Sequence, residues 1–531
     1  MNTKQKTAKL IRFLSFLLVL AMLVGSVPDI AFASNEASEA EGVMTKELNE
    51  SDAGQADQQG YLETLGDSEA WDGTTKNEPS ADADGVYQIG TAEELAWFAE
   101  QVNITTQGAI SFNAVLTGDI DLNNKEWTPI GSDQGNKYKG SFDGRGYSIT
   151  GLSITSSPVA KFSCGLFGSV DGVEIKNLSV SGRKDINSSP SNVDAAGGLV
   201  GKAYGSSIVL NCFNSVGISV TNSTATVALG GIVGNMQFSD CKILCCGNFA
   251  DISSIGGGVD NNKTFSAGGI CGFMRSGCHI DSCWNRGNIK STLNSFGKAN
   301  AGGILGTCNA KSGNAKTINN CFSIGSVSTE STGNFYGSEL NAGGIQGRQR
   351  ALPMPALNCY YLQSSCGAGA NLESNPGPGS TPNNDGISAK SESELKSEDF
   401  IAQLNGNVPL TEYSAVWVSG ADSYPEISEV KKHKGIKSFI IDGVSGVIDG
   451  ENMTITLTMP AGTDVSQLTP VITCFGNVES VPASGQVQDF TNPVIYRVGD
   501  LTYTVTVYVE YAITGEGTEE SPYLIDCPKA L

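Results

Sequence analysis

Near-copies of one short glycine motif recur along the chain, and this repetition is the feature that most constrains the fold. Each copy reads glycine, leucine or isoleucine, a variable residue, and glycine. The copies are Gly165–Gly168, Gly198–Gly201, Gly231–Gly234, Gly269–Gly272, Gly303–Gly306 and Gly344–Gly347. Their final glycines are separated by 33, 33, 38, 34 and 41 residues. A period in this range indicates a repeat protein, in which each repeat packs on its neighbours.

A second series of residues keeps the same period, with steps of 34, 33, 38, 38 and 38 residues. These register residues are Leu178, Cys212, Cys245, Cys283, Cys321 and Cys359. Because leucine exchanges with cysteine at this position, we interpret the cysteines as small hydrophobic residues stacked along a core. Disulfides between them are the alternative, but a disulfide also requires a Cβ geometry that spacing does not supply.

The residues around the register position predict a corner in each repeat. An apolar residue stands three positions earlier, at Ile175, Val209, Ile280 and Ile318, and asparagine stands one position earlier, at Asn177, Asn211, Asn320 and Asn358. Residues three apart on a straight strand point to opposite faces, so both are buried only if the chain turns between them. At that corner, stacked asparagine amides could form a ladder.

One coil of short strands per repeat predicts a right-handed parallel β-helix solenoid over residues 85–430, with the hand taken from the general crossover preference. The two open ends of such a solenoid must be covered by other residues. Thr91 and Glu94 form a capping box before a helix that we expect to run to about Val102. Ser391 and Glu394 form a second box before a helix to about Leu404. The predicted fold class is therefore all-β with short capping helices.

The N-terminal segments have the composition of export and spacer sequences. Residues 1–33 combine basic residues, the apolar run Phe13 to Val24 and an Ala31-Phe32-Ala33 cleavage site, which predicts a signal peptide. Residues 34–84 are strongly acidic with few apolar residues, which predicts a disordered spacer. We find no later apolar segment long enough to span a bilayer, so no stable membrane insertion is expected after cleavage.

The C-terminal part changes character. Residues 431–512 contain short alternating segments separated by turn residues, which predicts an Ig-like β-sandwich after the solenoid. Residues 513–531 repeat the spacing of Tyr87, Ile89 and Leu95 with Tyr523, Ile525 and Leu531, so we interpret them as the start of a second, truncated repeat unit. The chain is then a fragment of a longer protein, or a truncated product.

The net charge of the chain argues against strongly negative partners. With 33 basic and 55 acidic residues, the chain has a net charge of −22, which argues against nucleic acid and against anionic membrane surfaces.

The repeats resemble the GLUG-motif proteins of bacterial cell surfaces, whose core is seen in Gly165-Leu166-Phe167-Gly168 and its isoleucine variants. The flanking Ala-Gly-Gly and the signature Asn-Cys-Phe or Asn-Cys-Tyr, as in Asn211-Cys212-Phe213, also match. The resemblance implies a secreted or surface location and a modular role. Some such proteins carry the motif beside IgA-cleaving metallopeptidases. The H-E-x-x-H zinc-peptidase pattern is absent from this sequence, so no catalytic residue carries over.

An aromatic residue follows the register position at Phe213, Trp284, Phe322 and Tyr360. Facing outward, these four would form a stripe suited to a sugar or an apolar partner. Lying in the wall of the coil, they would be packing residues, and repeat-register positions favour packing.

Cys241, Cys278 and His279 are the candidates for a metal site. Aligning the repeats on Cys245 and Cys283 puts Cys241 level with His279, and zinc favours cysteine and histidine ligands. The C-x-x-C pairs typical of structural zinc sites are absent from the sequence. We therefore expect no metal, no cofactor and no catalytic residue.

These observations support three hypotheses for function. The first is a non-catalytic scaffold of adhesion type, in which loops such as Thr221 to Val227 and Gly256 to Ser266 bind a glycan, a protein or a cell-wall component. The second is a surface carbohydrate-active enzyme or peptidase whose catalytic part lies downstream or is unrecognised. The third is a mechanical stalk.

Overall fold

The structure is a computed structural model that describes residues 70–104, 112–131, 135–155, 162–187, 193–237, 240–259, 261–275, 277–310, 317–351, 356–365, 375–376, 386–407, 412–450, 452–475, 478–510, 513–514, 518–519 and 524–525. Within them the chain is mostly β and forms a solenoid of about five turns, followed by small separate sheets. The predicted fold class is confirmed at this level. The right-handed winding stays a prediction.

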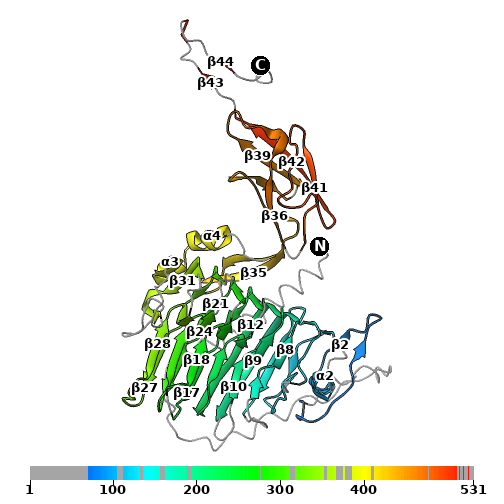
Figure 1. The fold of residues 1–531 in the computed structure, drawn as a ribbon. Helices are drawn as coiled ribbons and strands as arrows, with labels where there is room; N and C mark the ends of the chain where they lie inside the picture. The colour runs from blue at the N-terminus through cyan, green and yellow to red at the C-terminus, as the bar shows by residue number, and fades with distance from the viewer. Residues whose placement is uncertain are drawn as a thin grey trace, which may run out of the picture. The chain divides into compact units, whose positions relative to one another are not determined.

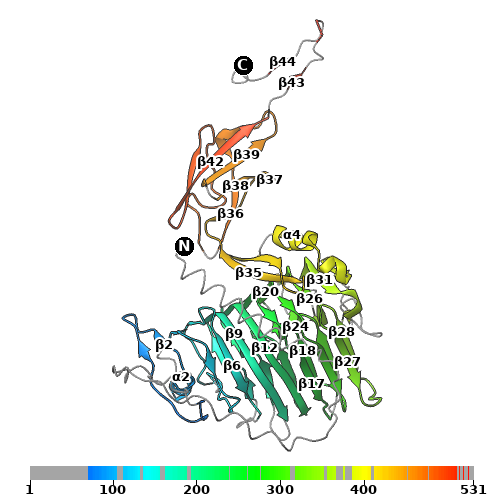
Figure 2. The ribbon, with the colours of Figure 1, turned by 180° about the vertical axis from the view of Figure 1, so that it is seen from behind.

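Three sheets form the walls of the solenoid (Figures 1 and 2). The first contains β1 (Ser80–Ala81), β2 (Tyr87–Ile89), β3 (Ala114–Leu116), β4 (Ile120–Asp121), β5 (Phe142–Asp143), β6 (Ser148–Ser153), β9 (Glu174–Asn187), β12 (Ile208–Ser223), β15 (Lys242–Leu244), β16 (Gly247–Asn248), β17 (Ile252–Gly256), β20 (His279–Asp281), β21 (Trp284–Asn285), β22 (Ile289–Leu293), β25 (Thr317–Asn319), β26 (Phe322–Ser323), β27 (Val327–Ser331), β30 (Ala356–Leu357), β31 (Cys359–Leu362) and β33 (Ile387–Lys390). The second contains β7 (Phe162–Cys164), β10 (Val193–Gly197), β13 (Val227–Gly230), β18 (Thr264–Gly268), β23 (Lys298–Gly302) and β28 (Glu339–Gly343). The third contains β8 (Phe167–Asp171), β11 (Val200–Tyr204), β14 (Val233–Met236), β19 (Cys271–Arg275), β24 (Leu305–Ala310), β29 (Gln346–Ala351) and β32 (Asn375–Pro376).

Each coil runs through the three sheets in the same order, and the strands of successive coils pair in parallel. One coil consists of β18, β19, β20, β21 and β22, and these pair with β23, β24, β25, β26 and β27 of the next coil. The glycine motif forms the turn between the second and third sheets. It therefore marks one fixed corner of every coil, as the period of the motif predicts.

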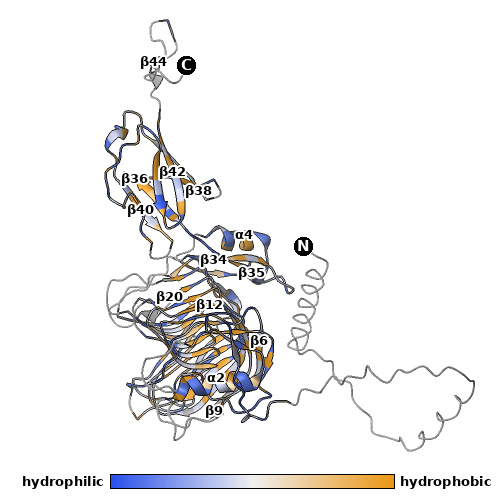
Figure 3. Ribbon diagram, turned by 90° about the vertical axis from the view of Figure 1, so that its right-hand side faces the viewer, coloured by the Kyte–Doolittle hydropathy of each residue, from blue (hydrophilic) through white to orange (hydrophobic). Residues whose placement is uncertain are grey.

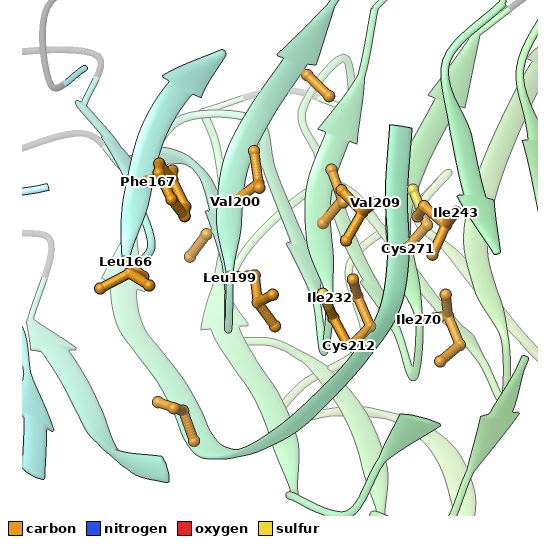
Figure 4. Packing of buried hydrophobic residues seen from close by; sticks show 14 of the residues in the cluster. Leu166, Phe167, Leu199, Val200, Val209, Cys212, Ile232, Ile243, Ile270 and Cys271 are labelled. Carbon is orange, nitrogen blue, oxygen red and sulfur yellow. The ribbon is translucent and has the colours of Figure 1, made fainter. Parts of the chain in front are cut away.

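The second residue of the glycine motif fills the core. Leu166, Leu199, Ile232 and Ile270 lie side by side on successive coils (Figure 4), and all four are fully buried. Burying a leucine or isoleucine side chain contributes about 1.5–3 kcal/mol. Because every coil repeats this contact with its neighbours, the core forms a continuous column along the solenoid.

Cysteine side chains from successive coils stack in the core as predicted for the register residues, except that one coil contributes a different cysteine. The backbone N–H of Cys212 donates to Sγ of Cys246, that of Cys246 to Sγ of Cys283, and that of Cys283 to Sγ of Cys321, each at 3.4 Å. The prediction that Cys245 belongs to this column is wrong by one residue. Cys245 instead occupies the corner before it, with φ of 55°.

The predicted corner is confirmed by backbone conformation. Asn177, Asn211, Asn320 and Asn358 all have φ between 52° and 54°. Asparagine tolerates this left-handed region better than most residues, which explains its recurrence there. The side chain of Asn211 donates to Asn177 at 2.9 Å, so one rung of the expected amide ladder is present.

A second amide ladder, which we did not predict, lies inside the wall. Asn214 donates to Asn248 at 2.8 Å, and Asn248 donates to Asn285 at 2.7 Å. The three side chains are completely buried. They pack against the first glycine of the motif, where a Cβ at Gly198 would lie 2.0 Å from Oδ1 of Asn214. Because that glycine has no side chain, it leaves space for the buried amide ladder.

The N-terminal end of the solenoid is covered by α2 (Ala92–Ile104), seen with its hydrophilic and hydrophobic residues in Figure 3. The predicted capping box is confirmed, because the N–H of Glu94 and the N–H of Thr91 each bond to the other residue's side chain. Phe98 is buried against aromatic rings of the first coils. Trp71, which we assigned to the acidic spacer, is also buried and packs on Trp127.

The second capping box is also confirmed, but the helix after it is divided. α3 (Glu392–Leu395) is capped by Ser391, and α4 (Glu398–Gly406) begins anew at Ser397. A hairpin of β34 (Tyr413–Ser419) and β35 (Pro425–Lys432) follows. Together they form a C-terminal cover, defined here as the described residues of 391–432. A short 3₁₀ helix, η1 (Gln363–Ser365), precedes them.

Residues 436–509 form a small domain with its own core. One sheet contains β36 (Ile436–Ile441), β37 (Val444–Ser445) and β40 (Pro470–Cys474). The other contains β38 (Val447–Asp449), β39 (Thr454–Met459), β41 (Val494–Val498) and β42 (Leu501–Val509), and η2 (Val465–Gln467) precedes β40. Strands form where the sequence predicts them, and β39 pairs with β42 in parallel. The Ig-like assignment stays a prediction.

The remaining segment predictions lie largely outside the described residues. The signal peptide over 1–33 lies wholly outside them, as does the spacer up to residue 69. Of the tail over 513–531, the structure describes only β43 (Ile513–Thr514), β44 (Leu524–Ile525) and residues 518–519.

Candidate functional site

The four predicted aromatic residues form a row on the outer face of the first sheet. Phe213 is level with Gly247, Gly247 with Trp284, Trp284 with Phe322, and Phe322 with Tyr360. The neighbouring register cysteines point into the core, so the aromatic side chains point outward. The indole of Trp284 lies over Gly247, where a Cβ would be 2.4 Å from the ring.

The C-terminal cover lies on this row. The Phe322 ring is 5.7 Å from that of Trp417 and 5.9 Å from that of Phe400, while Tyr360 is 5.0 Å from Phe400. Trp284, Phe322 and Tyr360 are buried, and Phe213, at the end of the row, is half-buried. The row therefore faces outward, and the chain's own residues cover it over most of its length. This arrangement is neither the open stripe nor the packing within the wall that the sequence suggested.

Arg286 connects the C-terminal cover to the coil on which it lies. Its guanidinium lies 5.0 Å from the Trp284 ring centroid, donates to Asp422 at 2.8 Å, and lies 3.3 Å from Glu426. Burial raises the pKa of Glu426, and Arg286 opposes this shift by favouring the ionised carboxylate. The contact therefore combines a cation–π interaction with two ion pairs.

The candidate metal residues are only partly brought together. Because the register residue is Cys246, Cys241 is level with Cys278, and His279 is level with Lys242. Both thiols are buried, whereas His279 lies on the outer face with Nε2 3.7 Å from Oδ1 of Asp240. In the part of the chain that the structure describes, no group of three or more His, Cys, Asp or Glu residues could hold a metal ion.

The second histidine, His433, forms a serine–histidine pair. Its Nε2 lies 2.6 Å from Oγ of Ser414, and its ring stacks on Phe475. Burial and the nearby Lys431 lower the pKa of His433, which favours the neutral imidazole. Among the described residues no carboxylate bonds to the other ring nitrogen, so the pair lacks the acid of a catalytic triad.

The thiols of the solenoid should be unreactive in the folded protein. Eleven of the twelve described cysteines are buried and none of the twelve is disulfide-bonded, so a reagent in solution cannot reach these eleven thiols before unfolding. With an aromatic disulfide reagent at pH 8, we expect at most the other three cysteines to react before unfolding and all 14 after it. Fewer than 12 in denaturant would mean that at least one described cysteine is disulfide-bonded, which would contradict this packing.

A different surface carries most of the exposed large apolar residues of the described solenoid. It is formed by three loops of successive coils, at residues 255–259 with 261–264, 293–298 and 331–340, and we call it the three-loop surface. Val259 is 94 % exposed and Tyr336 is 93 % exposed, the highest values among the large apolar residues that the structure describes. Ile255, Phe296 and Leu340 are also exposed. Clustered apolar exposure of this kind marks interaction sites.

Hydrogen bonds hold the three loops together. The side chain of Asn261 donates to the carbonyl of Tyr336 at 3.0 Å and accepts from the hydroxyl of Ser338 at 3.0 Å. The N–H of Gly258 donates to the carbonyl of Phe296 at 2.7 Å. Because Asn261 reaches a loop 75 residues later in the chain, the first loop bonds to the third across two coils.

A tight turn displays Tyr336. The N–H of Ser338 donates to the carbonyl of Phe335 at 3.0 Å, and Gly337 has φ of 76°. A turn with positive φ at its third residue requires glycine there and leaves the second residue, Tyr336, pointing away from the chain. Phe335 packs on Phe296 with ring centroids 5.7 Å apart, which supports the base of the turn.

Sequence reasoning identified the first loop as variable but missed Phe296 and Tyr336. Their signal was weak, because single aromatic residues in glycine-rich loops are common. The available clue was that three successive loops each combine Gly and Asn with an aromatic or β-branched residue, and that the second and third also contain Ser. Loops of this composition are typical of antibody paratopes, where tyrosine supplies contact area and small polar residues adapt to a ligand.

The fold and this surface define the chain as a β-solenoid that exposes a cluster of apolar loop residues. No helix among the described residues is long and apolar enough to cross a membrane.

Comparisons with known proteins match the chain over different lengths. The family model described as "SGBP, N-terminal" matches residues 436–514, the small domain. Halomucin of Haloquadratum walsbyi is 26 % identical over 481 residues, which is 83 % of this chain and 5 % of halomucin. The immunoglobulin A1 protease of Streptococcus pneumoniae is 26 % identical over 208 residues, 36 % of this chain and 10 % of that protein. The chain thus spans a small part of both curated relatives.

Among solved structures, a candidate immunoglobulin A1 protease from Bacteroides ovatus is 20 % identical, with a TM-score of 0.42 over 66 % of this chain and 95 % of that one. A structure described as IgA1 protease is 13 % identical, with a TM-score of 0.33 over 80 % of this chain and 34 % of that one.

Proposed function

We propose that this chain is a secreted or surface-displayed, non-catalytic scaffold of adhesion type that presents solenoid loops to a glycan, a protein or a cell-wall component. The observation that carries the proposal is the three-loop surface, where Val259 and Tyr336 are almost fully exposed on loops fixed by hydrogen bonds. Exposing apolar residues on ordered loops is unfavourable unless a partner covers them.

The comparisons support an extracellular location. The small domain matches the N-terminal family model of surface glycan-binding proteins, which is consistent with a cell-surface protein. We therefore propose that the Ig-like small domain is a spacer and that the solenoid carries the binding loops. Binding by exposed loops on a rigid repeat scaffold is a common arrangement.

The second candidate is a surface carbohydrate-active enzyme or peptidase whose catalytic part is unrecognised in this chain or lies downstream of it. The observation that favours it is the match to 10 % of an immunoglobulin A1 protease. If the catalytic part lies downstream, the solenoid would position a catalytic domain near its substrate, and this chain alone would have no turnover.

A direct test compares binding with turnover. The secreted chain and a double variant, V259S/Y336S, would be screened against neutral glycans and extracellular proteins, with glycosidase and peptidase assays in parallel. We expect binding by the parent chain, a loss of at least about tenfold in the variant, and no turnover. Both side chains are more than 90 % exposed, so the variant should fold. Turnover without loop-dependent binding would reverse the proposal.

A further inference from the structure

We propose, on the basis of the function proposed above, that the partner of the three-loop surface is a protein, and that Val259 and Tyr336 are the two anchors that enter apolar pockets on it. The alternative for the same surface is a glycan. The choice between them rests on how apolar and charged groups are distributed over the loops.

The exposed groups of this surface are aliphatic as well as aromatic. Val259, Ile255 and Leu340 are 94 %, 37 % and 42 % exposed, and they accompany Phe296 and Tyr336. Sugars stack on aromatic rings, but a valine at a loop tip offers them neither a flat face nor a hydrogen bond. A protruding valine gains free energy only when a partner's apolar side chains surround it.

Charges stand at the edge of the surface and are paired. Lys298 bonds to Glu339, and Arg348 lies 2.6 Å from the same carboxylate. Lys290 lies 2.8 Å from Glu330 beside the loops. Within the described loop residues, Lys263 is the one further charged side chain, and it is half-buried. An apolar centre inside a polar, charged rim is the anatomy of a protein–protein interface.

The anchors are held before any partner arrives. The Tyr336 turn is fixed by the Ser338 to Phe335 hydrogen bond, and the loop of Val259 is fixed by the Asn261 contacts to Tyr336 and Ser338. Rigid anchors lower the entropy lost on binding. Tyrosine is also among the residues that most often dominate interface energetics.

The experiment measures binding of the full chain to immobilised serum immunoglobulins, fibronectin, laminin and collagen, beside a neutral glycan array and phosphatidylcholine vesicles. Val259→Ser and Tyr336→Ser are the test variants. Val447→Ser and Tyr508→Ser are matched controls, since these residues are 71 % and 56 % exposed on the small domain. Sedimentation of the chain alone reports self-association.

We expect saturable binding to at least one protein, weakened about 30-fold or more by Tyr336→Ser, clearly weakened by Val259→Ser and changed less than about twofold by the controls.

Three results would overturn the inference: no protein bound below about 10 μM, binding that neither loop variant weakens, or self-association that both variants abolish. Loop-dependent binding to a glycan or to vesicles would also overturn it. The glycan result would leave the proposed scaffold function standing, whereas hydrolytic turnover without any loop-dependent binding would remove both.

Discussion

Gly197→Ala should destabilise the solenoid by more than about 4 kcal/mol, the range in which a single substitution prevents normal folding. A Cβ at this position would lie 2.0 Å from the carbonyl oxygen of Val200 and 2.7 Å from that of Ile232 in the next coil. Both atoms belong to backbone that the parallel sheets hold in place, so neither can move away. The next coils show the same close approach at Gly230, Gly268 and Gly302.

The matched control for this variant is Gly217→Ala. Gly217 lies within β12 of the same solenoid, but a Cβ there would meet no atom within 4 Å. We expect Gly217→Ala to be neutral or to stabilise by up to about 1 kcal/mol, because alanine restricts the unfolded chain. Thermal unfolding followed by far-ultraviolet circular dichroism measures both. Equal midpoints for the two variants would show that the glycine immediately before each motif is not required for close packing.

The sequence predicts the solenoid well because two series of residues, the motif glycines and the register residues of the core, have the same period. A repeat fold depends mainly on contacts between neighbouring coils, so a pattern with the period of one coil contains most of the information. Capping boxes were equally reliable, since their bonds join residues three apart. Both features are local or strictly periodic.

The register error at Cys245 has a physical cause. Two cysteines are adjacent there, and spacing alone does not show which one enters the core. The deciding signal was Asn248, which aligns with Asn214 and Asn285 only if Cys246 is the register residue. A buried amide needs its partner in the next coil, so this alignment is a stronger constraint than the small volume of a thiol.

The candidate site was harder to predict than the fold. The outward direction of the aromatic row is consistent with strand alternation, but the cover over Phe322 comes from Phe400 and Trp417, which lie 78 and 95 positions later. The bond between Asn261 and Tyr336 likewise joins residues 75 apart. A short stretch of sequence does not reveal contacts between residues so far apart, because it is the path of the coils that brings these residues together.

Trp284→Ala should destabilise the protein by about 3–5 kcal/mol and loosen the C-terminal cover. The indole is 1 % exposed, with Phe249 at 4.6 Å edge-on, Phe322 at 6.4 Å and the Arg286 guanidinium at 5.0 Å. Its Nε1 has no hydrogen-bond partner among the described residues, so the loss is one of packing and of the cation–π contact. Trp284→Phe keeps a ring there and should cost less.

The control for this variant is Phe213→Ala, because Phe213 ends the same row and is only half-buried. We expect a smaller loss there, about 1–2 kcal/mol, and no change in the cover. Urea unfolding measures the stability, and limited proteolysis with mass spectrometry reports cleavage within residues 391–432. If Trp284→Ala kept parental stability and protease resistance but lost a bound sugar or protein, the row would be a ligand face and the packing interpretation would fail.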